Sequence, residues 1–438
     1  MRQLPIVSCA LTACVVLMAF AAFEPQPASA AEISAPLTDI VTGLPLLYAS
    51  YVTQYDGMLY FRGSIDTSGT NTSIWRSDGL AAEAVPGTTS PNGASYLSAH
   101  GGKLYYAYSL SGAPRLWQYD PVGGAQQAPG SSANLQNPEE MASYSGKLYF
   151  RATRYGSPGN IGTELWTFDG TNQTPIDLFP GIGSSNPQHF IQYDGQLYFN
   201  ACGTPGQGTE LWRTNGVGMP TLAAQIYPDH GSSPEQFAVF NNQLYFSAYD
   251  GVHGRELWRF DGTGAAPAAD IFPGVGFTSS NPNNLAAYNN KLYFSATDAI
   301  HGYELWSFDG TTAQMVPEIN PTPDPLNGDT FLMDSSPADL TVFNGLLYFS
   351  ADDGVHGREL WSYDGTSVSM VEDLNPGQYG SSPTELTVYG GKLYFSADDG
   401  YNPGVRALMP SVFVLTPEPA TLALLAAGAL GLLRRRRG

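Results

Sequence analysis

A short aromatic motif recurs eight times along the chain and constrains its fold more than any other feature. Each copy reads Leu-Tyr-Phe, or Leu-Tyr-Tyr in the second, and follows a turn-forming dipeptide such as Asp56-Gly57 or Asn344-Gly345. These dipeptides accept a positive φ and close type I′ turns, so each copy predicts a β-hairpin. The copies lie 44 to 55 residues apart and begin at Leu59, Leu104, Leu148, Leu197, Leu244, Leu292, Leu347 and Leu393.

A second motif follows each hairpin and is most complete over residues 357–366, which read Gly-Arg-Glu-Leu-Trp-Ser-Tyr-Asp-Gly-Thr. It predicts a third strand that runs into another tight turn, so that each unit holds four antiparallel strands. Seven units place a tryptophan at one position of this motif, and we align Met409 with that position in the eighth. A tryptophan buries roughly 150–250 Å², so we expect these rings to dock neighbouring units. They are Trp75, Trp117, Trp166, Trp212, Trp258, Trp306 and Trp361.

The repeat length and the four strands per unit are typical of a β-propeller blade. Along each Leu-Tyr-Phe strand, Leu and Phe point to one face and Tyr to the other, which makes both faces apolar. A solenoid would also bury both faces, but antiparallel units lack the parallel rungs of a β-helix, and a closed ring leaves no unit without a partner. We therefore predict an all-β domain over residues 31–415, a propeller of eight four-stranded blades.

The sequence is compatible with two ways of closing this ring. Residues 34–41 resemble the fourth strand of the seventh repeat, yet they stand before the first repeat. This segment can complete the last blade, which would close the ring with strands from both ends of the chain. Alternatively, it is the innermost strand of the first blade, and every blade is then contiguous in sequence.

Two resemblances rest on the second motif. The copies with Glu-Leu-Trp intact resemble the bacterial ELWxxDGT repeat family, whose members are mostly exported proteins of unknown activity. Residues 351–361 are similar to the tryptophan-docking motif of eight-bladed quinoproteins, although His356 stands where that motif usually has Thr. This second resemblance implies that Trp, Ala and Gly interlock adjacent blades, more than it implies a shared activity. The intact copies lie at Glu164, Glu210, Glu256, Glu304 and Glu359.

The first thirty residues have the features of a secretory signal peptide. Arg2 precedes an apolar stretch over residues 6–23, and Ala28 and Ala30 form an A-x-A cleavage site. Lipoprotein processing at Cys14 is the alternative. Removal of this segment leaves Cys202 as the only cysteine, which excludes an intrachain disulfide.

Residues 416–438 resemble the PEP-CTERM sorting signal of Gram-negative bacteria. A Pro-Glu-Pro motif precedes an apolar stretch over residues 420–433 and a final arginine cluster. The resemblance implies transient membrane insertion of a short C-terminal helix, cleavage by a membrane-embedded exosortase, and release to the envelope surface or the extracellular space. A permanent anchor is the alternative. The residues of this signal are Pro417, Glu418, Pro419, Arg434, Arg435, Arg436 and Arg437.

The net charge of the chain limits which classes of molecule it can bind. Lys and Arg number 19 against 39 Asp and Glu, which gives a net charge of −20. Nucleic acid is excluded, because phosphate binding needs concentrated Lys and Arg. Neutral or basic polymers fit better, and we expect an extracellular polysaccharide or a surface protein as partner.

Acidic loops between the second and third strands are the predicted binding face. Alternate loops of an antiparallel meander share one face, so these loops lie beside the blade-linking loops and opposite the tight turns. Two interpretations stay open, local Asx turns and Ca²⁺ binding, but no EF-hand loop is present and we expect no resident cofactor. The longest insertion, over residues 320–336, lies on the same face. The candidate residues are Asp250, His253, Asp298, His301, Asp353, His356, Asp399, Asp324 and Asp329.

Catalytic motifs do not occur in the sequence. It contains no H-E-x-x-H, Walker A, G-x-S-x-G or C-x-x-C pattern. We therefore expect an exported scaffold or binding protein, with an extracellular polysaccharide hydrolase or lyase as the alternative.

Overall fold

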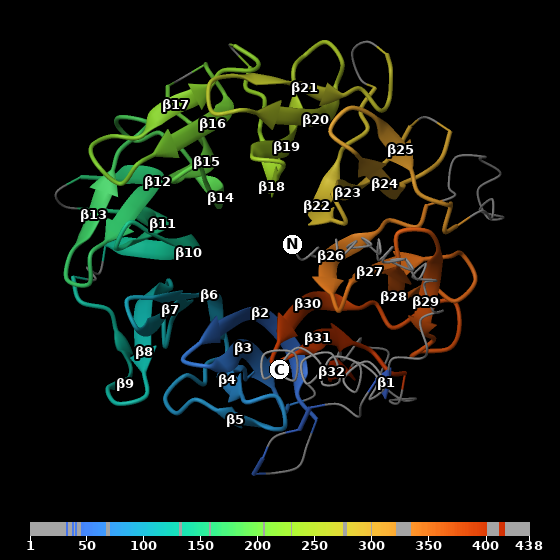
Figure 1. Ribbon diagram of the computed structural model, residues 1–438. Helices are drawn as coiled ribbons and strands as arrows, with labels where there is room; N and C mark the ends of the chain where they lie inside the picture. Colours follow the sequence, from blue (N-terminus) through green and yellow to red (C-terminus); the bar gives the residue numbers. More distant parts are fainter. Residues whose placement is uncertain are drawn as a thin grey trace, which may run out of the picture.

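The computed structural model shows eight four-stranded antiparallel blades around a ring (Figure 1). Its described residues form 32 strands and no helix, which confirms the predicted all-β propeller. Blades 1 to 7 follow one another along the chain. Blade 8 combines the strands β30 (Thr384–Tyr389), β31 (Lys392–Ala397) and β32 (Ser411–Thr416) with the N-terminal strand β1 (Glu32–Ile33). The structure describes residues 32–33, 37–38, 40–41, 45–66, 71–130, 134–156, 159–204, 206–228, 230–274, 278–298, 300–320, 334–400 and 411–416.

Every blade has the same strand order from the centre of the ring outward. The innermost strands are β2 (Leu47–Tyr55), β6 (Ala94–His100), β10 (Leu135–Tyr144), β14 (Gln188–Tyr193), β18 (Glu235–Phe240), β22 (Asn283–Tyr288), β26 (Ala338–Phe343) and β30 (Thr384–Tyr389). The second strands are β3 (Met58–Ser64), β7 (Lys103–Tyr108), β11 (Lys147–Arg154), β15 (Gln196–Cys202), β19 (Gln243–Tyr249), β23 (Lys291–Ala296), β27 (Leu346–Asp352) and β31 (Lys392–Ala397). The third strands are β4 (Ser73–Ser77), β8 (Arg115–Asp120), β12 (Ile161–Phe168), β16 (Thr209–Thr214), β20 (Arg255–Phe260), β24 (Glu304–Phe308), β28 (Arg358–Tyr363) and β32 (Ser411–Thr416). The outermost strands are β5 (Ala82–Ala84), β9 (Gly124–Gln127), β13 (Gln173–Ile176), β17 (Thr221–Ala224), β21 (Ala265–Ala269), β25 (Ala313–Met315), β29 (Val368–Glu372) and β1 (Glu32–Ile33).

The ring closes through the N-terminal strand. Strand β1 pairs antiparallel with β32 and is the outermost strand of blade 8, which confirms the first of the two arrangements. The pairing strand is Glu32–Ile33, slightly before the segment expected from the sequence. The chain then reaches blade 1, where the Ala82 amide donates to the Thr38 carbonyl over 3.1 Å. Backbone hydrogen bonds therefore join the N-terminal segment to both blade 8 and blade 1.

The alignment of Met409 with the tryptophan position is wrong. In the other blades the tryptophan pairs with the third residue of the first motif, as Trp361 does with Phe349. In blade 8 the partner of Phe395 is Phe413, and the two rings stack with centroids 5.8 Å apart. The loop before β32 is longer than its counterparts, so a fixed loop length places the motif too early. Met409 itself lies outside the described residues.

Eight apolar clusters fill the interfaces between consecutive blades, one at each interface. Between blades 6 and 7, for example, Tyr293 of the earlier blade meets Leu347 and Trp361 of the later blade. The ring of Tyr293 also lies 5.6 Å from that of Tyr363. Each Leu-Tyr-Phe strand thus contributes to the clusters on both of its faces, as the alternation predicts.

The seven tryptophans lie in these clusters, each against the preceding blade. Two of them, Trp166 and Trp361, also donate from Nε1 to an alanine carbonyl of the second strand over 3.0 Å. Trp117 and Trp212 are half-buried, and the other five are buried. Their contribution to stability stays a prediction.

The recurring glutamate of blades 3 to 7 is buried and binds the loop that leads to the next blade. In blade 5, Glu256 accepts from the Ile271 amide over 2.8 Å and from the Ser280 amide over 2.9 Å. The Ser280 hydroxyl adds a third bond of 2.5 Å. Equivalent bonds join Glu164 to Ser185 and Glu359 to Ser381. These bonds satisfy the buried carboxylate and fix the path between blades.

Replacing Trp361 by Ala is expected to lower the free energy of unfolding by about 3–5 kcal/mol, because the ring fills a buried inter-blade cluster. Trp117→Ala is the matched control and should cost less, since that ring is half-buried. Denaturant unfolding of the full chain measures both. Equal, small losses would contradict a docking role.

The free energy of unfolding should fall as the pH rises from about 4.5 to 7. Burial raises the pKa of Glu304 from 4.5 to about 7, although the Ser335 hydroxyl and amide oppose this shift. In that window the folded chain retains a proton that the unfolded chain releases, so rising pH favours unfolding. Urea titrations between pH 5 and 8 measure the slope, which should be shallower in Glu304→Gln. An unchanged slope in that variant would refute this assignment.

Candidate functional site

Every innermost strand carries a β-bulge that turns one side chain toward the centre of the ring. In β18, Glu235 pairs with Ser247 but Ala238 pairs with Tyr245, so one extra residue stands on the inner strand. Such a bulge bends the strand and redirects its side chains. The bulged residues have φ between 53° and 59°. We call them the channel ring: Tyr51, Tyr96, Glu140, His189, Gln236, Asn284, Asp339 and Glu385.

None of the eight positions of the channel ring is glycine, although their left-handed backbone favours glycine. An L-residue in this conformation costs roughly 1–2 kcal/mol. The chain retains a side chain at every position in spite of that cost, and all eight side chains carry a group that can form hydrogen bonds.

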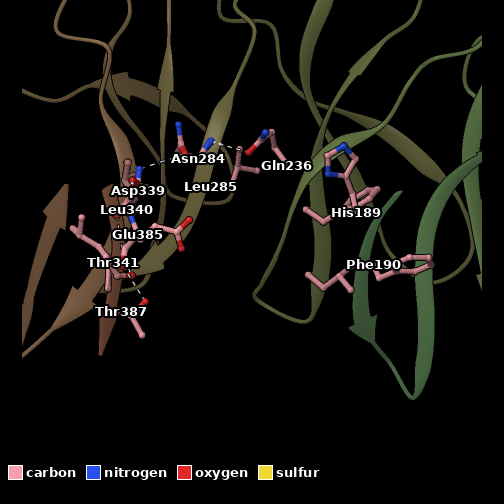
Figure 2. A pocket seen from close by; sticks show the side chains of 13 residues that line it. His189, Phe190, Gln236, Asn284, Leu285, Asp339, Leu340, Thr341, Glu385 and Thr387 are labelled. Atoms are coloured by element: carbon pink, nitrogen blue, oxygen red, sulfur yellow. Dashed lines mark hydrogen bonds between the residues drawn. The ribbon is translucent and has the colours of Figure 1, made fainter. Parts of the chain in front are cut away.

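Two cavities are lined chiefly by the channel ring and its neighbours on the innermost strands. The larger, of about 560 Å³, is lined by residues of β14, β18, β22, β26 and β30 and includes His189, Asp339 and Glu385. Figure 2 shows Gln236, Asn284, Asp339 and Glu385 around it. The other, of about 300 Å³, is lined by Tyr51, Tyr96, Glu140, Phe190 and Glu385 together with apolar neighbours. Both volumes are in the range of small-molecule sites.

Hydrogen bonds join members of the channel ring across blade boundaries. The backbone N–H of Asn284 donates to Gln236 Oε1 over 3.1 Å, and the backbone N–H of Glu385 donates to Asp339 Oδ2 over 3.2 Å. The backbone N–H of Asp339 donates to Asn284 Oδ1 over 3.4 Å, so that the three bonds together link the four consecutive blades 5 to 8 (Figure 2). Glu140 accepts from the His189 amide in the same way. Each bond orients a side chain and leaves further acceptor capacity on it.

The channel ring contains three carboxylates, Glu140, Asp339 and Glu385, and no Lys or Arg is among the described residues that line these two cavities. Arg358 lines an adjoining cavity of about 420 Å³ that shares Asn284 and Asp339, and its charge opposes the rise in the pKa of Asp339. Burial raises the pKa of Asp339 and of Glu385, and the charge of Asp339 adds to the shift at Glu385. A positively charged or hydrogen-bond-donating ligand suits such a site.

The two sides of the channel differ in chemistry. In blades 1 and 2 the rings of Tyr51 and Tyr96 lie with centroids 5.3 Å apart and planes at 47°. Phe190 of β14 lines the same cavity. In blades 5 to 8 the ring positions hold amides and carboxylates instead. The channel therefore offers an aromatic side and a polar side.

The predicted Asp and His residues occupy three separate loops, in blades 5, 6 and 7. In each loop the histidine Nδ1 forms a hydrogen bond with the aspartate of the same loop. The distance from Nδ1 to Asp Oδ2 is 2.7 Å both for His253 and Asp250 and for His356 and Asp353. Each Asp also accepts two backbone amides, as Asx turns do. His301 and Asp298 repeat this arrangement at 3.0 Å.

No three His, Cys, Asp or Glu residues in the described part of the chain come together as a metal site. Hydrogen bonds and the charge of Asp250 raise the pKa of His253, and Asp353 does the same for His356. Asp399 lies in the loop after β31. The remaining candidates, Asp324 and Asp329, lie outside the described residues, as do Ala28 and Ala30. Ligand binding by this face stays a prediction.

Sequence reasoning missed the channel ring. Its members share a register, since each stands eight residues before the leucine of the first motif, as Gln236 does before Leu244. Residue types at this register vary between blades, while the surrounding motif is uniform. That contrast was the available signal.

Comparison with known proteins identifies one motif and several distant likenesses in fold. Residues 415–437 match the PEP-CTERM protein-sorting motif, a range that contains Pro417 to Arg437. These residues are outside the described part except for the end of β32. No curated protein matches the sequence. No helix among the described residues is long and apolar enough to span a membrane.

Three solved structures illustrate the likenesses in fold. A puromycin hydrolase is 14% identical with a TM-score of 0.47, over 84% of this chain and 61% of its own. A puromycin-hydrolyzing peptidase of Mycobacterium tuberculosis is 11% identical with a TM-score of 0.48, over 85% of this chain and 61% of its own. The β-propeller domain of the Trilobed protease from Pyrococcus furiosus is 11% identical with a TM-score of 0.42, over 75% of this chain and 98% of its own. This chain thus spans about three fifths of the length of the two hydrolases, and its propeller assignment rests on its own strand pairing.

The fold and the sorting motif together define a class. The chain is an exported eight-bladed propeller of the Gram-negative cell envelope that is sorted by exosortase.

A chelator is expected to leave the melting temperature unchanged. Each aspartate of the Asp–His loops already accepts backbone amides and a histidine, so no metal is needed to satisfy it. Thermal melts with EDTA and with added Ca²⁺ measure this. A melting temperature that falls with EDTA and recovers with Ca²⁺ would show a structural metal instead.

Proposed function

We propose that this protein is an exported binding protein whose central channel holds a small molecule or a segment of an extracellular polymer. The observation that carries the proposal is the channel ring, in which eight left-handed positions all keep a polar or aromatic side chain. Strained backbone positions of this kind concentrate at functional sites. The two cavities supply the space that a ligand needs.

The blades are a rigid support for such a site. Buried glutamates fix the blade connections, and apolar clusters fill every blade interface. The inner strands that carry the channel ring are therefore held by the same core as the rest of the propeller. A preorganised site loses less entropy on binding than a mobile one. The surface or matrix location expected from the sequence would expose this site to extracellular polymers.

A polysaccharide-acting enzyme is the second candidate function. Asp339 and Glu385 lie in adjacent blades, are joined through the Glu385 amide, and both have a raised pKa. Paired carboxylates with raised pKa values are suited to general acid and base chemistry. Turnover of a captured glycan would favour this candidate over simple binding.

An array of neutral and amino-bearing oligosaccharides, probed with the full-length chain, tests both candidates. We expect binding that is weakened about tenfold in His189→Ala, since that change removes a polar group from the larger cavity. His253→Ala, in an outer loop, is the matched control and should bind normally. Analysis of the bound glycan should find it intact. Released product that disappears in Asp339→Asn would instead support the enzyme, and binding unaffected by His189→Ala would refute the channel site.

A further inference from the structure

We infer that the smaller cavity of the channel binds an alkylammonium group, either on a free organic cation or at the end of a larger ligand. This inference rests on the proposed function of the channel and names the chemistry of one of its sides. The cavity measures about 300 Å³ and brings together two tyrosines, a phenylalanine and two carboxylates.

Aromatic rings and carboxylates line the cavity from different blades. Tyr51 and Tyr96 come from blades 1 and 2, and their planes meet at 47° so that they form two walls of a corner. Phe190 enters from blade 4. An ammonium group is attracted to the faces of such rings, and aromatic cages are the usual recognition site for quaternary ammonium.

The carboxylates are held in place at the same cavity. Glu140 accepts from the His189 amide over 3.3 Å, and Glu385 accepts from the Val52 amide over 3.5 Å. The Tyr51 backbone also donates to Glu385, and these few donors leave each carboxylate with unused acceptor capacity. Their negative charges complement a cation and oppose an anion.

The remaining wall distinguishes an organic cation from a metal ion. Val52, Leu97 and Met141 line the cavity, and these side chains offer hydrocarbon or thioether surface to a ligand. Calcium and magnesium bind oxygen ligands, whereas this wall offers only hydrocarbon and thioether groups. The methyl groups of an alkylammonium ion, in contrast, pack well against aliphatic side chains while its charge faces Glu140 and Glu385.

The rings of the channel tyrosines contact each other across blades 1 and 2. Four of the polar ring members, Glu140, Gln236, Asn284 and Asp339, accept inter-blade bonds from neighbouring ring members. The two tyrosines keep φ values of 56° and 55°, which a bulky side chain rarely adopts. A ligand that contacts the two rings accounts for their presence.

Titration calorimetry of the full-length chain with choline and with 3,3-dimethylbutan-1-ol tests the inference. The two probes share their shape, but only choline carries a charge. We expect choline to bind about tenfold more tightly than the neutral probe, because of its attraction to the rings and carboxylates. Equal binding of the two probes, or binding of neither, would overturn the inference.

Variants locate the site. Tyr96→Ala should weaken choline binding about tenfold, whereas Tyr96→Phe keeps the ring face and should change it less than about twofold. Glu385→Gln should also weaken binding, since its amide oxygen can still accept from Val52 while the charge is lost. Tyr379→Ala is the matched control, because that ring is 75% exposed in an outer loop. Choline binding that survives both Tyr96→Ala and Glu385→Gln would place the cation elsewhere and overturn the inference.

The proposed function and the ammonium inference fail in distinguishable ways. Suppose that an oligosaccharide binds in a manner sensitive to His189→Ala while choline does not bind. The channel then remains a ligand site, and only the ammonium inference is overturned. If no oligosaccharide binds but choline binds in a manner sensitive to Tyr96→Ala, the inference is supported and the ligand is a free cation.

Discussion

An extra residue at one shared register of every innermost strand determines which side chains line the centre of this propeller, and β2 and β10 each carry a second bulge. The extra residue forces a left-handed bulge, and the bulge turns a side chain out of the blade interface and into the channel. Without it, the same position would lie on a face of the sheet that neighbouring blades cover. The eight bulges therefore convert a packed core into a lined cavity, at a conformational cost that recurs in every blade.

The rest of the blade is uniform, and this uniformity supports the varied centre. Buried glutamates in five blades bind the connecting loop through the same set of amide and serine donors. Aromatic clusters repeat at all eight interfaces. The channel ring, in contrast, changes from tyrosines in blades 1 and 2 to amides and carboxylates in blades 5 to 8. The residues that stabilise the blades thus lie between the blades and in their connecting loops, whereas the residues proposed to bind a ligand lie on the innermost strands.

Local patterns were sufficient to predict the blades, but not the site. Turn dipeptides and alternation predicted the hairpins, because both act over a few residues, and the eight copies of the Leu-Tyr-Phe motif gave the blade count. The aligned Met409 was wrong because loop length is free to vary between strands, and Phe413 takes that position. The channel ring escaped notice because no glycine marks its left-handed backbone. The Asp–His loops attracted attention through their composition, yet Asp250 and His253 satisfy each other locally.

The central claim is that the channel side chains are retained for a ligand and not for the fold. Paired measurement of unfolding free energy and ligand affinity in Tyr96→Gly tests it most directly, since glycine suits the left-handed backbone at that position. The account predicts a change in stability below about 1 kcal/mol together with loss of ligand binding. A loss of several kcal/mol of stability, as core truncations give, with ligand affinity unchanged would contradict it.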